Sequence, residues 1–149
     1  MATKSAPSAP AVPAPQITRI RMASLGALTM LIIQFLLGTA YAIYGTAPAS
    51  GKSIGLFSSP LLAVHVVMGI LLIISAIMLV VRALQAKIRP LVVTSVIGLL
   101  AILGAFGAGE GFARSGSDGA SLAMALLTAV AMLAYATSLV ISGRPRADG

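Results

Sequence analysis

Long apolar runs alternate with short polar segments along this chain, and the runs lack the every-second-residue alternation of a half-buried strand. Stretches such as LLIISAIMLVV are apolar on every side of a helix. About 20 apolar residues in a helix cross the roughly 30 Å hydrocarbon core of a bilayer. Four stretches without a formal charge are each long enough for one spanning helix, and they cover residues 22–51, 53–81, 90–109 and 119–143.

Capping residues and prolines near these runs predict where the helices begin. Ser59 is an expected N-cap, and Pro60 after it stands in the first turn, where a missing N–H costs no hydrogen bond. Pro90 opens the third helix for the same reason. Thr18 and Asp118 are the expected N-caps of the first and last helices.

Glycines predict where the helices end. Gly107, Gly109 and Gly111 are expected to loosen the backbone and end the third helix near residue 108, and Gly143 is expected to end the fourth. The predicted fold class is an all-α integral membrane protein, an up-down-up-down bundle with helices at about 20–44, 60–83, 90–108 and 118–142. These helices form a transmembrane domain over residues 18–143, between a disordered Ala/Pro-rich tail at 1–17 and a short tail at 144–149.

Composition agrees with a lipid environment. Apolar residues make up 58% of the 149 residues, charged residues make up 9%, and the mean hydropathy is +1.04. Soluble chains carry roughly 25% charged residues. The net charge of +7 would suggest a nucleic-acid partner in a soluble protein, but here the cations flank the apolar runs, so we expect a lipid bilayer and no nucleic acid as the partner.

The distribution of cations predicts the orientation. If the N-terminus is cytoplasmic, only Lys52 and Arg114 of the 10 cations lie outside. The positive-inside rule then places both termini in the cytoplasm of a multi-pass protein of the cell's inner or plasma membrane. The cations expected inside are Lys4, Arg19, Arg21, Arg82, Lys87, Arg89, Arg144 and Arg146.

Small and polar residues indicate how the helices pack. Small residues let helix backbones approach closely in lipid, and the expected inner stripe of the last helix is Ala125, Ala129, Met132 and Ala136. A polar side chain within a span is costly and needs a structural or functional reason. The polar residues of this kind are Gln34, Tyr41, His65, Thr128 and Tyr135.

His65, the only histidine, is the first candidate for chemistry. A neutral imidazole ligates haem iron, and Gly69, one helical turn further, would let a flat ring approach the helix. Met124 is the candidate second ligand, because it is expected at a similar depth in the last helix. The alternative is a neutral histidine that hydrogen-bonds Gln34, Tyr41 or a backbone carbonyl, with Met124 serving only for packing.

Three charged residues crowd the segment GAGEGFARSGSDGA. A functional interpretation makes Arg114 the partner of a haem propionate or another anionic group. The structural interpretation is a solvated loop in which Glu110, Arg114 and Asp118 lie near the start of the last helix. Cysteine is absent, so thiolate metal sites and cysteine nucleophiles are excluded. No span contains a carboxylate, which a small proton-coupled exporter would need.

Residues 31–82, with IIQFLLG in the first helix and HVVMGILLIISAIMLVVRA in the second, resemble a hairpin of haem A synthase. The resemblance implies a four-helix haem-binding module with His65 as the ligand and Gln34 and Gly38 as packing positions. The family pairs this histidine with one in the fourth helix, and the fourth run here has none. The first run also lacks the family's acidic residue. Haem-oxidising or haem-transferring catalysis is therefore not expected.

Two functions from different classes follow. The first is a small, non-catalytic membrane protein of the haem A synthase or b-type cytochrome kind that binds haem through His65. The second is a cofactor-free accessory subunit of a larger membrane complex. A homodimer could supply a second His65 to the haem.

Overall fold

A computed structural model describes residues 14–45, 48–49, 51–55 and 57–143. Its four helices are α1 (Ala14–Tyr44), α2 (Pro60–Ala86), α3 (Arg89–Ser115) and α4 (Asp118–Gly143). Each is long and apolar enough to cross a membrane. The expected all-helical fold with four spanning helices is confirmed, and the chain is a multi-pass membrane protein.

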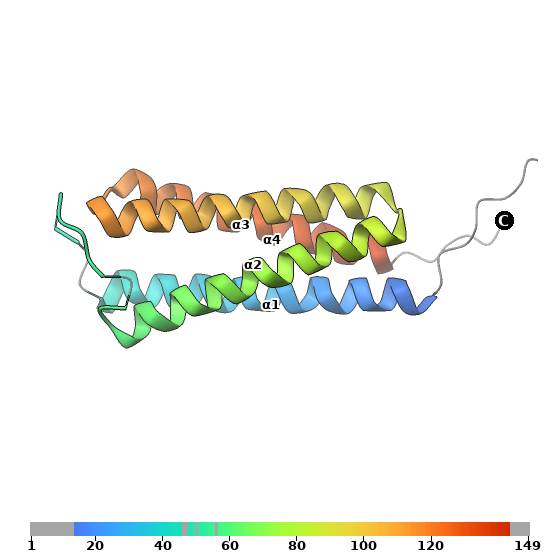
Figure 1. The fold of residues 1–149 in the computed structure, drawn as a ribbon, viewed down its shortest axis with the longest axis horizontal. Helices are drawn as coiled ribbons and strands as arrows, with labels where there is room; N and C mark the ends of the chain where they lie inside the picture. Colours follow the sequence, from blue (N-terminus) through green and yellow to red (C-terminus); the bar gives the residue numbers. More distant parts are fainter. Residues whose placement is uncertain (1–13, 46–47, 50, 56, 144–149) are drawn as a thin grey trace, which may run out of the picture.

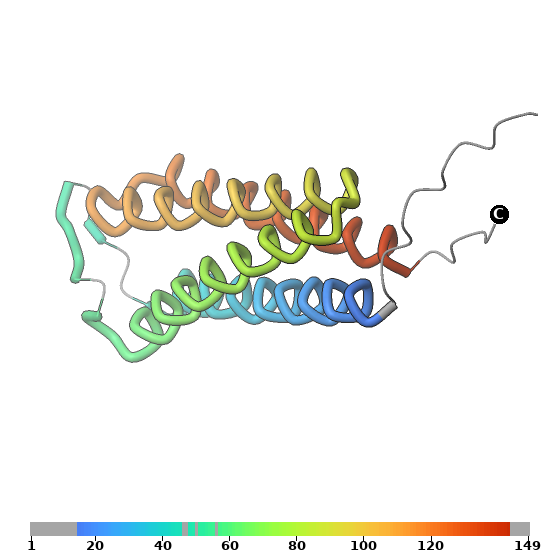
Figure 2. Tube along the Cα trace, turned by 45° about the vertical axis from the view of Figure 1, so that its right-hand side comes forward, coloured from blue at the N-terminus to red at the C-terminus, as the bar shows by residue number. Residues whose placement is uncertain are grey.

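The helices form one elongated bundle in which consecutive helices run in opposite directions (Figure 1). The first described residue of α1 and the last of α4 therefore lie at the same end. Around the bundle α1 contacts α2 and α4, and α3 contacts α4 and α2, whereas the two diagonal pairs do not approach each other. Figure 2 shows that α2 crosses the bundle obliquely, beside α1 at one end and beside α3 at the other.

The start of α2 confirms the expected capping. The Ser59 hydroxyl accepts a hydrogen bond of 3.2 Å from the Leu62 backbone N–H, and Pro60 stands in the first turn. The start of α1 differs from the prediction, because the helix begins at Ala14 and contains Thr18 in its interior. Pro15 explains the earlier start, since a first-turn proline needs no hydrogen-bond acceptor for its nitrogen. Residues 14–17, expected in the tail, are therefore helical, and the rest of the tail lies outside the described residues.

The end of α3 also corrects the prediction. The helix continues seven residues past 108 to Ser115 and ends at Gly116, which has a φ of +65° and donates its N–H to the Phe112 carbonyl. Leaving a helix within an apolar environment would orphan backbone groups, so glycines inside a span do not end it. At the start of α4, Asp118 is the first helical residue. The cap is Ser117, whose hydroxyl accepts from the Ala120 N–H at 3.4 Å.

Buried polar side chains lie on the inward faces of α1, α3 and α4, whereas the buried face of α2 is apolar. The side chains of Tyr41, Thr128 and Tyr135 are buried, and those of Gln34 and His65 are half-buried. The predicted inner stripe of α4 is wrong, because two of its four residues, Ala125 and Ala129, are exposed. The buried positions of α4 are Thr128, Ala131, Ala134, Tyr135 and Ser138. In α2, by contrast, small residues do lie on the inward face, where Gly69, Ala76 and Ala83 are buried.

The most extensive helix pair, α3 with α4, is held by a polar contact and by close approach at glycine. Thr94 and Ser138 share a hydrogen bond of 2.6 Å between the two helices. The ring of Tyr135, which is 0% exposed, lies directly against the backbone of Gly98. A Cβ at position 98 would lie 2.6 Å from Tyr135 Cζ.

The α1–α2 connection closes the end of the bundle opposite the termini. The Gly51 N–H donates to the Ser115 carbonyl at 3.2 Å, and the Ile54 N–H donates to the Ala113 carbonyl at 2.9 Å. These bonds satisfy carbonyls that the C-terminal turn of α3 leaves without helical partners. Figures 1 and 2 show this connection reaching from the α1–α2 hairpin to the end of α3.

Gly98→Ala should destabilise the bundle. The new Cβ overlaps the buried Tyr135 ring, and overpacking of this kind costs about 1–3 kcal/mol. The measurement is the apparent melting temperature in detergent, followed by circular dichroism, and we expect it to fall.

Gly107→Ala is the matched control in the same helix, because a Cβ at Gly107 meets nothing within 4 Å. This variant should be neutral or slightly more stable, since alanine favours a helix over glycine by roughly 1 kcal/mol. Equal melting temperatures for the two variants would contradict the close packing of Gly98 on Tyr135.

Candidate functional site

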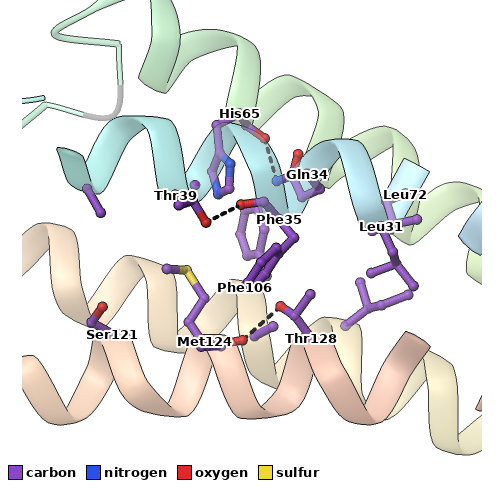
Figure 3. Close-up of a pocket in the computed structure, with 16 residues that line it drawn as sticks. Leu31, Gln34, Phe35, Thr39, His65, Leu72, Phe106, Ser121, Met124 and Thr128 are labelled. Carbon is purple, nitrogen blue, oxygen red and sulfur yellow. Dashed lines mark hydrogen bonds between the residues drawn. The ribbon is translucent and has the colours of Figure 1, made fainter. Parts of the chain in front are cut away.

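The half of the bundle next to the α1–α2 connection contains two adjoining cavities of about 160 and 320 Å³. All four helices contribute to their walls, which are mostly apolar. The two cavities share lining residues from each helix, and Figure 3 shows the smaller one. The shared residues are Gly38, Ala42, His65, Ala105, Phe106, Ser121 and Met124.

His65 enters this space from α2, about 8 Å along the helix from its start. Its backbone carbonyl accepts a hydrogen bond of 2.8 Å from the Gln34 side-chain Nε2 of α1, which ties the two helices together. The ring Nδ1 of His65 is buried and has no hydrogen-bond partner. The side-chain Oε1 of Gln34 is also buried without a partner. Gln34 therefore bonds the backbone of His65 rather than its ring, and the imidazole keeps an unsatisfied nitrogen.

Glycines on α1 and α2 make room for the side chains around His65. A Cβ at Gly38 would lie 3.2 Å from His65 Cε1, so the absence of a side chain there lets the ring rest against α1. A Cβ at Gly69 would lie 3.2 Å from Gln34 Nε2 and 3.6 Å from Phe106 Cδ2. The sequence suggested that Gly69 admits a flat ring, and the flat ring beside it in this structure is Phe106 of α3.

Phe106 was not foreseen as a site residue. It stands between Ala105 and Gly107 in a helix rich in small residues, and it lines both cavities. No spacing or motif distinguishes it from a lipid-facing phenylalanine. Its position depends on how α3 is rotated against α2.

Met124 lies opposite His65, on α4. Its side chain points into the space between the two hairpins, as does the His65 ring (Figure 3). A Cβ at Gly109 of α3 would lie 3.2 Å from the Met124 sulfur. The structure therefore brings both suggested iron ligands to the wall of the same cavities, along with Gln34 and Gly69 in the smaller one.

Arg114 lies apart from this group. Its guanidinium pairs with Glu110 at 2.5 Å on the surface of α3, and its side chain is 74% exposed. Arg114 does not line either cavity, although Glu110 lines the larger one. An exposed ion pair four residues apart contributes about 0.3–0.5 kcal/mol to a helix.

The arrangement offers ligand atoms rather than a catalytic set. Among residues 14–143 with their undescribed positions left out, no three His, Asp or Glu side chains cluster to hold a metal ion. The imidazole of His65, the thioether of Met124 and the amide of Gln34 line an apolar space. His65 Nδ1 and Gln34 Oε1 are themselves buried and have no hydrogen-bond partner. This set can hold an apolar ligand that needs one or two polar contacts.

Gln34→Leu should loosen the α1–α2 pair. The substitution removes the bond to the His65 carbonyl, and hydrogen bonds between spanning helices contribute roughly 1 kcal/mol. Thr39→Val on the same helix is the control, because Thr39 bonds only the Phe35 carbonyl of its own helix. Melting in detergent should show a larger loss for Gln34→Leu, and equal losses would mean that the interhelical bond adds nothing.

Comparisons with protein-family models, with curated proteins and with solved structures found no match to this chain. The resemblance of residues 31–82 to haem A synthase therefore gains no support from them and stays a hypothesis.

Proposed function

We propose that this integral membrane protein binds haem in the cavities beside the α1–α2 connection, with His65 as the axial ligand. One observation carries the proposal. The imidazole of His65, whose Nδ1 has no hydrogen-bond partner, and the thioether of Met124 line the same apolar space.

The residues present suit this ligand. Histidine alone, or histidine with methionine, holds haem iron in proteins, because the porphyrin nitrogens supply the other ligands. The larger cavity, about 320 Å³, falls within the range of roughly 300–1,000 Å³ for small-molecule sites. A porphyrin beside Gly69 requires the Phe106 ring to turn aside, since that ring packs there.

Bound haem would supply a one-electron redox centre, and the chain would supply its position and its apolar surroundings. We assign no catalytic residue, so the proposed role is binding or electron transfer rather than catalysis. Met124 as second ligand and a second copy of His65 across a dimer are two ways to complete the coordination.

The purified protein, expressed with ample haem and extracted in detergent, should show a Soret band. His65→Gly should lose the band, and added imidazole should restore it, because free imidazole can occupy the vacated space. Absorption spectroscopy measures both effects, and haem per chain distinguishes one haem per protomer from one per dimer. A spectrum without the band would favour the cofactor-free accessory subunit.

Met124→Leu tests the second ligand. We expect the Soret band to persist and the reduction potential to fall, since methionine ligation raises the potential of haem iron. Met78→Leu is the control, because Met78 is exposed on α2 and lines neither cavity. Identical reduction potentials for the wild type and Met124→Leu would show that Met124 is not a ligand of the haem iron.

We also propose that both termini face the cytoplasm of the inner or plasma membrane. Lys52 and Lys87 are exposed at opposite ends of the bundle, and the chain has no native cysteine. In intact cells a membrane-impermeant maleimide should label Lys52→Cys and leave Lys87→Cys unlabelled until the cells are opened. The reverse pattern would invert the topology.

A further inference from the structure

A third cavity lies at the end of the bundle that carries the termini. It measures about 540 Å³ and lies between the first turns of α1 and the last turns of α2. Four of its five lining side chains are polar. The lining residues are Pro15, Gln16, Arg19, Arg82 and Gln85.

Among the described residues, no salt bridge involves either arginine of this cavity. The chain has 3 acidic residues. Glu110 stands near the end of α3 and Asp118 at the start of α4, so both lie at the other end of the bundle. Asp148 lies outside the described residues. Among the described residues the salt bridge that forms is that of Glu110 with Arg114. Two guanidinium groups from different helices thus line one cavity without an ion pair to a described carboxylate.

The cavity lies at the ends of two helices that are long and apolar enough to span a bilayer. The ends of spanning helices lie near the lipid phosphate groups. A guanidinium binds phosphate through two parallel hydrogen bonds, and the side-chain amides of Gln16 and Gln85 can donate more. The N-terminus of α1 adds a partial positive charge. Basic pockets between spanning helices bind anionic lipid headgroups in this way.

We infer that this cavity binds the phosphate group of an anionic phospholipid through Arg19 and Arg82. The positive-inside rule explains why cations gather at this end, but it depends on their number and not on their meeting in one cavity. Arg21 and Arg89 lie at the same end and do not line the cavity. Both are exposed, as Arg19 is, whereas Arg82 is half-buried. Arg21 and Arg89 contribute equally to topology and give a matched comparison. The inference does not depend on haem binding.

The experiment compares Arg19→Gln/Arg82→Gln with Arg21→Gln/Arg89→Gln, two full-length variants of equal net charge. Binding of phosphatidylglycerol is measured by native mass spectrometry in detergent, with phosphatidylcholine as the neutral lipid. We expect the first variant to lose about tenfold more affinity for phosphatidylglycerol than the second. Equal losses would overturn the inference and leave the arginines as topology determinants only.

Two further arms identify the source of the phosphate and guard against misfolding. Inorganic phosphate should not compete with phosphatidylglycerol at millimolar concentration. Full competition would show that the cavity binds free phosphate, and it would overturn the inference that a lipid is the ligand. Arg19→Lys/Arg82→Lys keeps the charge but not the paired hydrogen bonds, and it should bind with intermediate affinity. Unchanged melting in phosphatidylcholine shows that each variant is folded, and wild-type affinity for the lysine variant would exclude guanidinium recognition.

Discussion

Every backbone amide and carbonyl within the hydrocarbon has to find its hydrogen-bond partner inside the protein, because lipid offers none. This constraint keeps the four helices continuous. The helix α3 runs through three closely spaced glycines to Ser115 without a break. The constraint also accounts for the α1–α2 connection, whose N–H groups bond the last carbonyls of α3. The bundle is therefore closed by backbone chemistry at the end that carries the site.

Buried polar side chains lie on the inner faces of α1, α3 and α4, and small and aliphatic residues form the inner face of α2. Tyr135 and Ser138 rotate α4 towards α3, where Gly98 leaves room for the tyrosine ring. Gln34 ties α1 to α2 through a carbonyl of α2. A few polar contacts of modest individual strength thus do the work that burial of apolar surface does in a soluble bundle.

The two halves of the bundle differ in how they are filled. Glycine contacts bring α3 and α4 close together, and the oblique path of α2 carries it from α1 at one end to α3 at the other (Figure 2). Cavities remain at both ends of α2. One is lined by mostly apolar side chains and by His65, and the other by Arg19, Arg82 and two glutamines. The same crossing helix thus provides His65 to one site and Arg82 to the other.

The sequence alone determined the number and approximate extent of the helices, because apolar length and charge depend only on composition along the chain. It also identified Ser59 as a cap and the polar side chains as inward-facing, since both follow from local chemistry. It could not determine which helix faces which, because small residues give no contrast in polarity against lipid. Hence the phase of α4, the packing of Phe106 beside Gly69 and the meeting of Arg19 with Arg82 were decided by tertiary structure. These features depend on helix rotation and crossing, which arise from contacts between segments far apart in the chain.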